Sequence, residues 1–446
     1  MSNQDIFKGK TFLLMHKDVP AVRFHFYKYE MWANVDEVLD KHHAPVNMVG
    51  HHKGSDSYLN KFLDHRVIPK DRPNISNIRD YFDSKSSLEL SLRSNMVSVS
   101  DHYWIKTEDS NLSWKDVNFY DNTFSNDPIF ISSLTSMHKN PGNFIPEKGL
   151  SPNVSNNGTS PQMWLKNEND IVLYKTGNQP FFQEPFNEVV ISDLLDVMNI
   201  EHTNYKMGVL ANSVVSECSA FTSGQIEFVP AWQLEKPSVK VNHLNGLENY
   251  FEFMRNQGIS VNSSIRKNVE EMIIIDYLTF NDDRHWGNFG ILRDSTTLEF
   301  KGVAPIFDNG RTFGYNSLNG NYENQASPYN LSKAFAESNT HDRELSFVTL
   351  NHDINFDKIR HEIPQIFEKR FEETKTLFNS IGNEENQTVV DILERKVPNL
   401  INTLQKRVNS LEKELIKKNK ITSQAIEITI DASNKKTMNK DKGIKK

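Results

Sequence analysis

A short polar turn in the second half of the chain carries the residue types that phosphoryl transfer requires. The turn runs from Asn281 to Asn288, and Asp283 lies five positions before Asn288. An Asp can accept the proton of an attacking hydroxyl, and an Asn at this spacing can ligate a metal ion. A second polar turn follows an apolar run and begins with Asp308. We therefore predict Asp283 as the catalytic base, and Asn288 and Asp308 as ligands of Mg²⁺, which prefers oxygen.

A lysine and a glutamate further upstream could serve the other end of a nucleotide. Lys175 closes an apolar run, and Glu188 lies thirteen positions later in a predicted helix. A Lys–Glu ion pair between a strand and a helix is the arrangement that kinases use to hold nucleotide phosphates. The turn-rich segment 151–160 precedes the strand and offers backbone N–H groups and hydroxyls to phosphates. It contains neither a Walker A sequence nor Gly-x-Gly-x-x-Gly.

Each of these features alone also has a purely structural explanation. Asp283 and Asn288 could cap turns, Lys175 could end a solvated strand, and Glu188 could favour a helix N-terminus. Segment 151–160 could be a flexible linker. We interpret His285 as a packed histidine that orients the polar turn. The order of the features along the chain is what favours phosphoryl transfer.

The surrounding sequence predicts the elements that would position these residues. Strands are expected at 170–175, 212–220 and 225–232, and a helix begins at Pro185. Another helix should begin with Ser263 or Ser264 as its N-cap, and residues 289–292 and 302–307 read as a hairpin. Residues 355–421 are mostly helical, and one apolar face of the last helix holds Val397, Leu400, Leu404, Val408, Leu411 and Leu415. Strands precede helices, which indicates an α+β protein with two lobes.

Composition narrows the functional class. The 446 residues include one cysteine, Cys218, and a net charge of −7, so a disulfide framework, a cysteine-based zinc cluster and a whole-protein nucleic-acid footprint are not expected. No apolar run approaches the ~18 residues of a membrane helix, and residues 1–10 lack an apolar segment. We expect a cytoplasmic protein without a membrane partner. Six lysines lie in the last stretch: Lys435, Lys436, Lys440, Lys442, Lys445 and Lys446.

The motifs together resemble those of the HipA-like serine/threonine kinases. The resemblance covers about residues 10–420 and is most specific in the polar turns. The matching segments are Asp283-Arg284-His285-x-x-Asn288 with Asn281 ahead of it, Phe307-Asp308-Asn309-Gly310, Tyr174-Lys175, and Glu184-Pro185-Phe186-Asn187-Glu188. Two looser matches are Leu150-Ser151-Pro152-Asn153 to Gly158, which resembles a phosphate loop, and the segment 97–105.

The resemblance implies a bilobal protein-kinase-like fold and a set of roles. Asp283 would be the catalytic base, Lys175 with Glu188 would grip the phosphates of ATP, and Asn288 and Asp308 would hold Mg²⁺. The backbone of a hinge at the end of a strand would face the adenine. The implied nucleotide contacts are Lys175, Ser151, Asn153, Ser155, Gly158, Glu217 and Ser219, with Cys218 in the same hinge.

The resemblance also implies a domain plan and partners. We expect an N-terminal accessory α+β element at 1–95, a kinase N-lobe at 96–235, a helical C-lobe at 236–422 and a flexible basic tail at 423–446. HipA-like kinases are often toxins paired with a small DNA-binding antitoxin, and they phosphorylate translation enzymes or themselves. Self-phosphorylation would fall on the hydroxyl cluster Ser151, Ser155, Thr159 and Ser160.

Two other functions remain open at this point. A phosphoinositide-type lipid kinase or small-molecule kinase also uses an Asp-Arg-His-x-x-Asn turn followed by a metal-binding Asp. The sequence has no membrane-binding stripe to support this alternative, and the lysine tail is the only basic cluster suited to anionic lipid. A catalytically silent kinase fold could act as a binding module. The loop 311–329 is rich in Asn, Gly and Ser and identifies no substrate.

Overall fold

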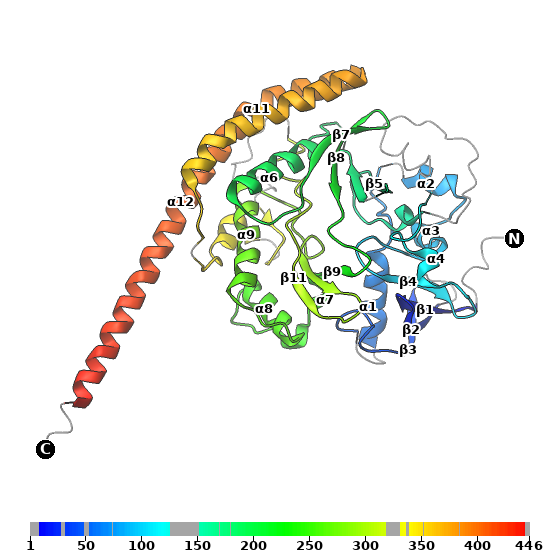
Figure 1. Cartoon of the computed structure of the whole chain (residues 1–446), viewed down its shortest axis with the longest axis horizontal. Coiled ribbons are helices and arrows are strands. Elements are labelled where there is room, and N and C mark those ends of the chain that lie inside the picture. Colours follow the sequence, from blue (N-terminus) through cyan, green and yellow to red (C-terminus); the bar gives the residue numbers. More distant parts are fainter. Residues whose placement is uncertain are drawn as a thin grey trace.

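The α+β class expected from the sequence is confirmed, with antiparallel sheets in the N-terminal part and helices in the C-terminal part (Figure 1). The structure is a computed structural model. It describes residues 9–27, 32–48, 53–73, 75–124, 151–168, 170–178, 180–317, 331–335, 339–350, 352–382 and 384–441. Leu150, residues 318–330 of the loop after Asp308, and the tail lysines Lys442, Lys445 and Lys446 lie outside these ranges.

The first sheet is antiparallel and has the strand order β3-β2-β1-β4. Its strands are β1 (Thr11–His16), β2 (Val19–Phe26), β3 (Ala33–Val38) and β4 (Tyr103–Thr107). Helix α1 (Lys53–Asp64) packs against β3, and the shared core includes Phe24 and Phe62. Because β4 pairs with β1, this sheet takes a strand from beyond the boundary expected at residue 95.

The second sheet carries the predicted lysine strand. Its order is β5-β6-β8-β7, with β5 (Gln162–Lys166), β6 (Ile171–Lys175), β7 (Lys206–Leu210) and β8 (Ser213–Ser219). The strands predicted at 170–175 and 212–220 are therefore confirmed as β6 and β8, whereas the edge strand β7 was missed. Helix α6 (Glu184–Met198) contacts β7 and β8, and Pro185 occupies its first turn as expected.

The third sheet joins the two halves of the chain. The predicted hairpin forms as β10 (Gly290–Asp294) and β11 (Phe300–Val303), which pair antiparallel. Strand β9 (Ile226–Pro230) pairs with the other edge of β10, giving the order β11-β10-β9. The boundary expected at residue 235 therefore falls next to a strand that pairs with the hairpin beyond it.

Long helices cover the C-terminal part and bury most of the apolar core. They are α8 (Gly246–Asn256), α9 (Ser263–Thr279), α11 (Phe356–Ile381) and α12 (Glu384–Asp441). The apolar face predicted for the last helix is buried in the core that these helices share with α6. The N-cap of α9 is Asn262, whose side chain accepts the N–H of Ile265, one residue before the predicted serines.

The tail expected to be flexible from residue 423 is helical in the structure as far as Asp441, where α12 extends beyond the body of the molecule (Figure 1). No glycine or proline interrupts the chain between Pro398 and Gly443, so no helix breaker ends α12 earlier. In the part of the chain that the structure describes, no helix combines the length and the apolar character needed to cross a bilayer.

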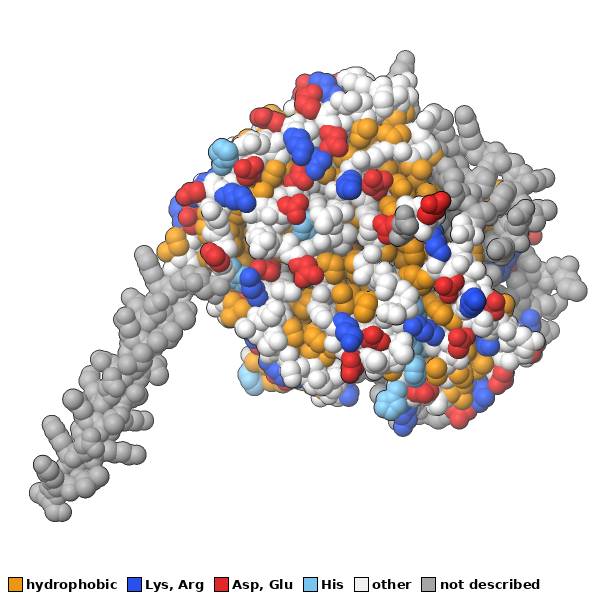
Figure 2. All heavy atoms as spheres, viewed as in Figure 1, with side chains coloured by type: hydrophobic (Ala, Val, Ile, Leu, Met, Phe, Trp, Pro, Cys, Tyr) orange, Lys and Arg blue, Asp and Glu red, His pale blue; other side chains and the backbone are white. Residues whose placement is uncertain are grey.

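Short elements complete the fold. The helices are α2 (Ile75–Tyr81), α3 (Ser87–Arg93), α4 (Trp114–Val117), α7 (Ala231–Leu234) and α10 (His341–Leu345), with 3₁₀ turns at Pro152–Ser155 and Pro237–Val239 and a small pair of strands, β12 (Leu331–Ser332) and β13 (Asn339–Thr340). On the face shown in Figure 2, acidic and basic side chains are interspersed and do not gather by sign.

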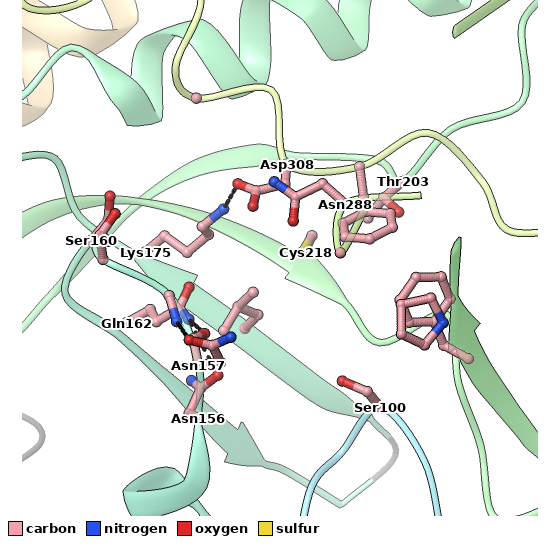
Figure 3. A pocket seen from close by; sticks show the side chains of 18 of the residues that line it. Ser100, Asn156, Asn157, Ser160, Gln162, Lys175, Thr203, Cys218, Asn288 and Asp308 are labelled. Atoms are coloured by element: carbon pink, nitrogen blue, oxygen red, sulfur yellow. Dashed lines mark hydrogen bonds and ion pairs between the residues drawn. The ribbon is translucent and has the colours of Figure 1, made fainter. Parts of the chain in front are cut away.

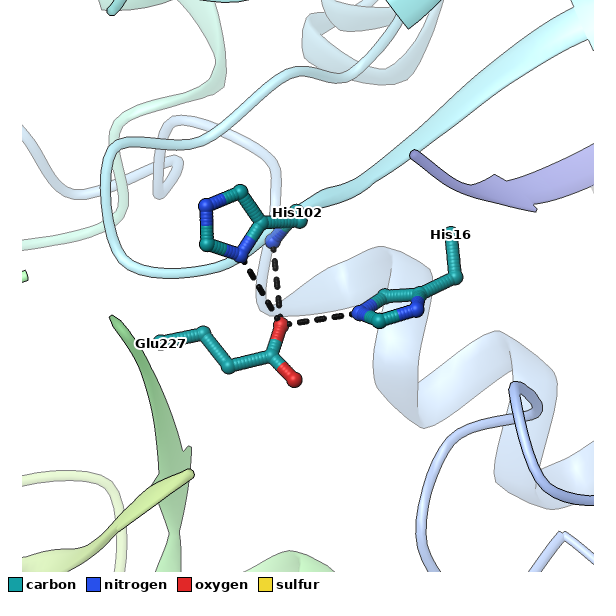
Figure 4. Close-up of side chains that lie close together, drawn as sticks. All are labelled: His16, His102 and Glu227. Atoms are coloured by element: carbon teal, nitrogen blue, oxygen red, sulfur yellow. Dashed lines mark hydrogen bonds and ion pairs between the residues drawn. The ribbon is translucent and has the colours of Figure 1, made fainter. Parts of the chain in front are cut away.

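A buried glutamate fastens the first sheet to the third. Glu227 of β9 accepts hydrogen bonds from His16 Nε2 at 3.0 Å and His102 Nδ1 at 3.3 Å, and its carboxylate lies between the two rings (Figure 4). Arg293 of β10 donates from Nε to the same carboxylate at 2.7 Å. The backbone N–H of His102 also donates to this carboxylate. Together with Arg293, these donors make the Glu227 carboxylate the centre of an ion-pair network. This convergence of donors disfavours a cation at the same point.

We predict that Glu227→Gln lowers the free energy of unfolding by about 3–5 kcal/mol, because Arg293 loses its buried counter-ion. Hydrogen bonds from His102 and His16, together with Arg293, outweigh burial and hold the pKa of Glu227 well below 4.5. A lowered folded-state pKa contributes stability above the unfolded-state pKa, and that stability is lost as pH falls. Urea unfolding should therefore show a gap between wild type and variant that narrows below about pH 4.5.

The control is Glu299→Gln, which alters an exposed pair with Lys301 and should change stability by no more than ~0.5 kcal/mol. A Glu227→Gln protein as stable as this control at neutral pH would contradict the assignment of Glu227 as a buried fastening.

Candidate active site

A cavity of about 450 Å³ opens between the second sheet, the polar turns and the first α+β region, which consists of the first sheet and helices α1 to α3. Its wall includes Lys175, Glu188, Asp283, Asn288 and Asp308, all of the residues predicted to perform chemistry. Figure 3 shows the side chains of Lys175, Asn288 and Asp308 at the same end of the cavity. The fold thus brings together groups that are up to 133 positions apart in the sequence.

Lys175 connects the lysine strand, helix α6 and the second polar turn. Its ammonium donates to Glu188 Oε1 at 2.9 Å and to Asp308 Oδ1 at 2.5 Å, and only 11% of the side chain is exposed. Burial by itself would lower the pKa of Lys175, but Asp308 and Glu188 outweigh it and raise that pKa. The same contact with Lys175 overcomes burial and lowers the pKa of Asp308. The pair is therefore charged at neutral pH, as phosphate and metal binding would need.

Both polar turns are entered through residues with left-handed backbone conformations. Phe280, which ends α9, has φ of 51°, and Asp308 has φ of 57°. Such conformations cost energy in residues other than glycine and are common at functional sites. Gly310 follows Asp308 closely, and an added Cβ there would lie 3.1 Å from Glu184 Cβ, so a glycine lets this turn approach α6.

The first polar turn presents one amide oxygen and one carboxylate to the cavity. Asn288 donates from Nδ2 to the backbone carbonyl of Asp283 at 3.0 Å, which commits its nitrogen and leaves Oδ1 as the atom available to a cation. Asp283 Oδ1 lies 3.0 Å from Lys333 Nζ, and its Oδ2 lies 3.6 Å from Arg311. Burial, with Asp283 beside it, raises the pKa of Asp282 to about 6. The donor set of Asn288 and Asp308, all oxygen, fits Mg²⁺.

Arg284 is the fully buried residue that holds the two polar turns together. Its guanidinium donates to Asp276 of α9 at 2.9 Å and to the backbone carbonyls of Asn288 and Phe307. A further bond reaches Asn309 Oδ1 at 2.6 Å. Arg284 belongs to the Asp-Arg-His-x-x-Asn motif, but no role was predicted for it from the sequence. The signal that could have found it is Asp276, a carboxylate inside an otherwise apolar helix segment.

The predicted nucleotide contacts divide into two groups. Gly158, Cys218 and Ser219 line the cavity with Lys175. The side chains of four others lie outside its wall: Ser151, Asn153, Ser155 and Glu217.

Local structure explains why these four side chains turn away. Side chains alternate along a strand, so Ser216 and Cys218 of β8 face the cavity and Glu217 faces the other side. Asn153 is buried and hydrogen-bonded to the backbone of Trp164, and Ser155 is buried against Ser94. Ser151 is also buried, and its hydroxyl accepts the backbone N–H of Asn153.

Several wall residues were not expected from the sequence. Phe62 lies near the end of α1, His65 and Arg66 lie in the turn that follows it, and Trp232 comes from α7; the His65 ring stacks on Trp232 with 4.4 Å between centroids. The first α+β region thus forms part of the cavity. His285 is exposed on the wall rather than packed, and its Nδ1 accepts the N–H of Gly287 at 3.0 Å. The prediction of a packed histidine at this position was wrong.

Comparisons with known proteins agree with a kinase. No protein-family model matches the chain. Serine/threonine-protein kinase CtkA of Helicobacter pylori is 28% identical over 128 residues, which is 28% of this chain and 39% of that relative. The matched segment therefore spans well under half of the relative.

Two solved structures are also similar. The crystal structure of the Helicobacter pylori proinflammatory kinase CtkA covers 56% of this chain and 95% of its own, at 19% identity and a TM-score of 0.36. HipA of Shewanella oneidensis, in complex with HipB and operator DNA, covers 90% and 97%, at 11% identity and a TM-score of 0.46.

We predict that Arg284→Ala lowers the free energy of unfolding by about 3–5 kcal/mol, because it leaves Asp276 buried without a counter-ion. Chemical unfolding followed by tryptophan fluorescence would measure the loss. Removing both charges with Asp276→Leu and Arg284→Met should recover part of it, since no buried charge then remains unpaired.

Arg360→Ala is the control, because Arg360 forms ion pairs that stay partly exposed to solvent, and its loss should cost ~1 kcal/mol or less. If the Arg284→Ala loss were equally small, Arg284 would not be the link between the turns.

Over 128 residues the chain is thus similar to a curated serine/threonine kinase, which bears out the serine/threonine-kinase part of the resemblance predicted from the motifs.

Proposed function

We propose that this protein is an ATP-dependent serine/threonine protein kinase of the HipA-like type. The observation that carries the proposal is the ion-paired cluster of Lys175, Glu188 and Asp308 in the same cavity wall as Asp283 and Asn288. The match to a curated serine/threonine kinase supports it. If the Lys175 cluster were only a structural ion pair, there would be no reason for the Asn288 amide and the Asp283 carboxylate to line the same cavity.

Each residue would contribute positioning or charge to phosphoryl transfer. Lys175, held by Glu188, would donate hydrogen bonds to phosphate oxygens of ATP. Asn288 Oδ1 and Asp308 would hold Mg²⁺, which when bound supplies positive charge against the phosphates. Asp283 would orient a serine or threonine hydroxyl and accept its proton. The hydroxyl oxygen bonds to the γ-phosphorus, the bond from that phosphorus to the bridging oxygen breaks, and ADP leaves.

The ion pairs around Asp283 suit this role. Lys333 Nζ lies 3.0 Å from its Oδ1 and Arg311 lies 3.6 Å from its Oδ2, and these contacts orient the carboxylate within the cavity wall. Since the protein supplies charge and geometry and forms no covalent intermediate with the phosphate, catalysis would rest on positioning and electrostatics.

We predict that Asp283→Asn reduces phosphate transfer by about 10²–10⁴-fold, because the variant cannot accept the proton of the hydroxyl. ATP binding and thermal stability should change little. The assay is transfer of radiolabel from ATP to proteins of a whole-cell lysate, with magnesium present and with a chelator as a second condition.

Asp357→Asn, at an exposed position in the first turn of α11, is the matched control and should transfer at the wild-type rate. Wild-type turnover by Asp283→Asn would remove the assigned role. Transfer to lipid vesicles and not to protein would favour a lipid kinase instead, and tight ATP binding without any transfer would favour a binding module.

The acceptor and the partners follow from the resemblance. A protein acceptor, either a translation enzyme or the kinase itself, and a small DNA-binding antitoxin are the partners that HipA-like kinases take. We propose the cytoplasm as the site of action, which suits a chain whose one cysteine, Cys218, is unpaired.

The structure refines the proposal of self-phosphorylation. Ser151 and Ser155 are buried and hydrogen-bonded, so their hydroxyls are not accessible while the loop keeps this conformation. Thr159 and Ser160 line the cavity. A phosphate on either would add a charge of about −1.5 to −2 beside the nucleotide site and would oppose nucleotide binding.

We predict that incubation with Mg²⁺ and ATP places phosphate on Thr159 or Ser160 before Ser151 or Ser155. Mass spectrometry of the peptide between residues 150 and 162 over time would show the order. The Asp283→Asn protein serves as the inactive control. An early phosphate on Ser151 or Ser155 would show that the loop leaves this conformation first, and no phosphate in the peptide would remove self-phosphorylation here.

A further inference from the structure

Arg72 is a buried guanidinium that contacts the predicted phosphate loop. It lies in the turn between α1 and α2, and only 3% of the residue is exposed. Burial lowers the pKa of Arg72 to about 9. Within the ranges that the structure describes, no carboxylate forms an ion pair with it. A buried charge is costly unless it is hydrogen-bonded, so the groups that it contacts should explain why it is there.

Those groups are two carbonyls of the loop. Arg72 Nε donates to the Gly158 carbonyl at 2.7 Å, and its terminal nitrogen donates to the Asn156 carbonyl at 2.6 Å. In a trans peptide, the carbonyl of one residue and the N–H of the next point in opposite directions. The N–H groups of Asn157 and Thr159 are therefore directed away from Arg72. Both residues line the cavity.

A second residue fixes the loop from the side of the sheet. Gln162 of β5 donates from Nε2 to the Asn157 carbonyl at 2.5 Å and to Asn156 Oδ1 at 3.2 Å. Gly158 has φ of 135°, and a Cβ there would lie 2.3 Å from Gln162 Nε2, so glycine permits this close approach. The loop is thus held between the first α+β region, through Arg72, and the second sheet, through Gln162. Figure 3 shows Asn156, Asn157 and Gln162 across the cavity from Asp308.

The loop retains a donor suited to an anion. Asn156 Nδ2 is buried and has no hydrogen-bond partner among the described residues. An unsatisfied buried donor costs about 1–3 kcal/mol, and Asn156 is itself one of the residues that line the cavity. The Lys175 ammonium lines the same cavity and carries the charge that a phosphate needs.

We propose that Arg72 is a positioning residue for triphosphate binding. By holding the carbonyls of Asn156 and Gly158, it directs the N–H groups of Asn157 and Thr159 into the cavity without itself touching the nucleotide. The first α+β region would therefore have a role in the kinase site, because its Arg72 holds the predicted phosphate loop on the side away from the cavity. The proposal rests on the proposed ATP-binding function and deepens it.

The test compares ATP with adenosine, which lacks phosphates. Arg72→Lys keeps the charge but loses the planar fork that reaches two carbonyls at once. Losing one charge-assisted hydrogen bond to the loop should weaken ATP binding about 10-fold or more, measured by calorimetry with magnesium, and leave adenosine binding within about 2-fold. The control is Arg93→Lys, since Arg93 also donates to a backbone carbonyl of the accessory region, that of Phe82, away from the loop.

A nucleotide-free measurement keeps the test separate from the proposed function. Subtilisin should cut Arg72→Lys faster than wild type within residues 156–160, while Arg93→Lys is cut at the wild-type rate; mass spectrometry locates the cut. If Arg72→Lys does not fold, Gln162→Leu removes the opposite tether and should give the same selective loss of ATP binding.

Equal weakening of ATP and adenosine binding, or no change in either, would overturn the role of Arg72. A wild-type protein that binds neither ligand would overturn the proposed function, and the cleavage rates would still decide whether Arg72 orders the loop.

Discussion

The site depends on one buried guanidinium, Arg284. Its donors reach the carboxylate of Asp276, the carbonyls that precede and follow the hairpin, and the amide of Asn309. Helix α9, the first polar turn and the second polar turn are therefore fixed to one rigid group. An arginine suits this task because its five donors lie in one plane and keep their charge when buried. A flexible residue at this point would let the two turns separate.

Around this centre, each charged side chain of the predicted site lies beside a side chain of opposite charge. Lys175 lies between Glu188 and Asp308, and Asp283 lies between Lys333 and Arg311. Contacts with Asp308 and Glu188 raise the pKa of Lys175 and the contact with Lys175 lowers the pKa of Asp308, so these two groups stay charged, whereas burial raises the pKa of Glu188. A ligand that brings phosphate and a divalent cation would replace these ion pairs: the phosphate would contact Lys175, and the cation would contact Asp308. The site is thus prepared for charged ligands.

The first α+β region belongs to this machinery and is not a separate appendage. Glu227 fastens it to the hairpin through His16, His102 and Arg293. Its Arg72 contacts the phosphate loop, and its α1 contributes to the cavity wall. Since the region touches the cavity on two sides, a change in its packing would be transmitted to the loop and to the wall.

The sequence alone predicted the candidate catalytic residues and the local elements that hold them. Motif spacing selected Lys175, Glu188, Asp283, Asn288 and Asp308, and periodicity predicted their strand, helix and hairpin, because these depend on residues near in sequence. Tertiary structure decided which side chains reach the cavity. Strand alternation turned Glu217 outward, and packing buried Ser151 and Ser155. The tertiary structure also placed Arg72 against the loop carbonyls and Glu227 between the first and third sheets. The contact between Arg72 and Asn156 joins residues 84 positions apart and that between Glu227 and His102 joins residues 125 apart, and local sequence patterns carry no information about such pairings.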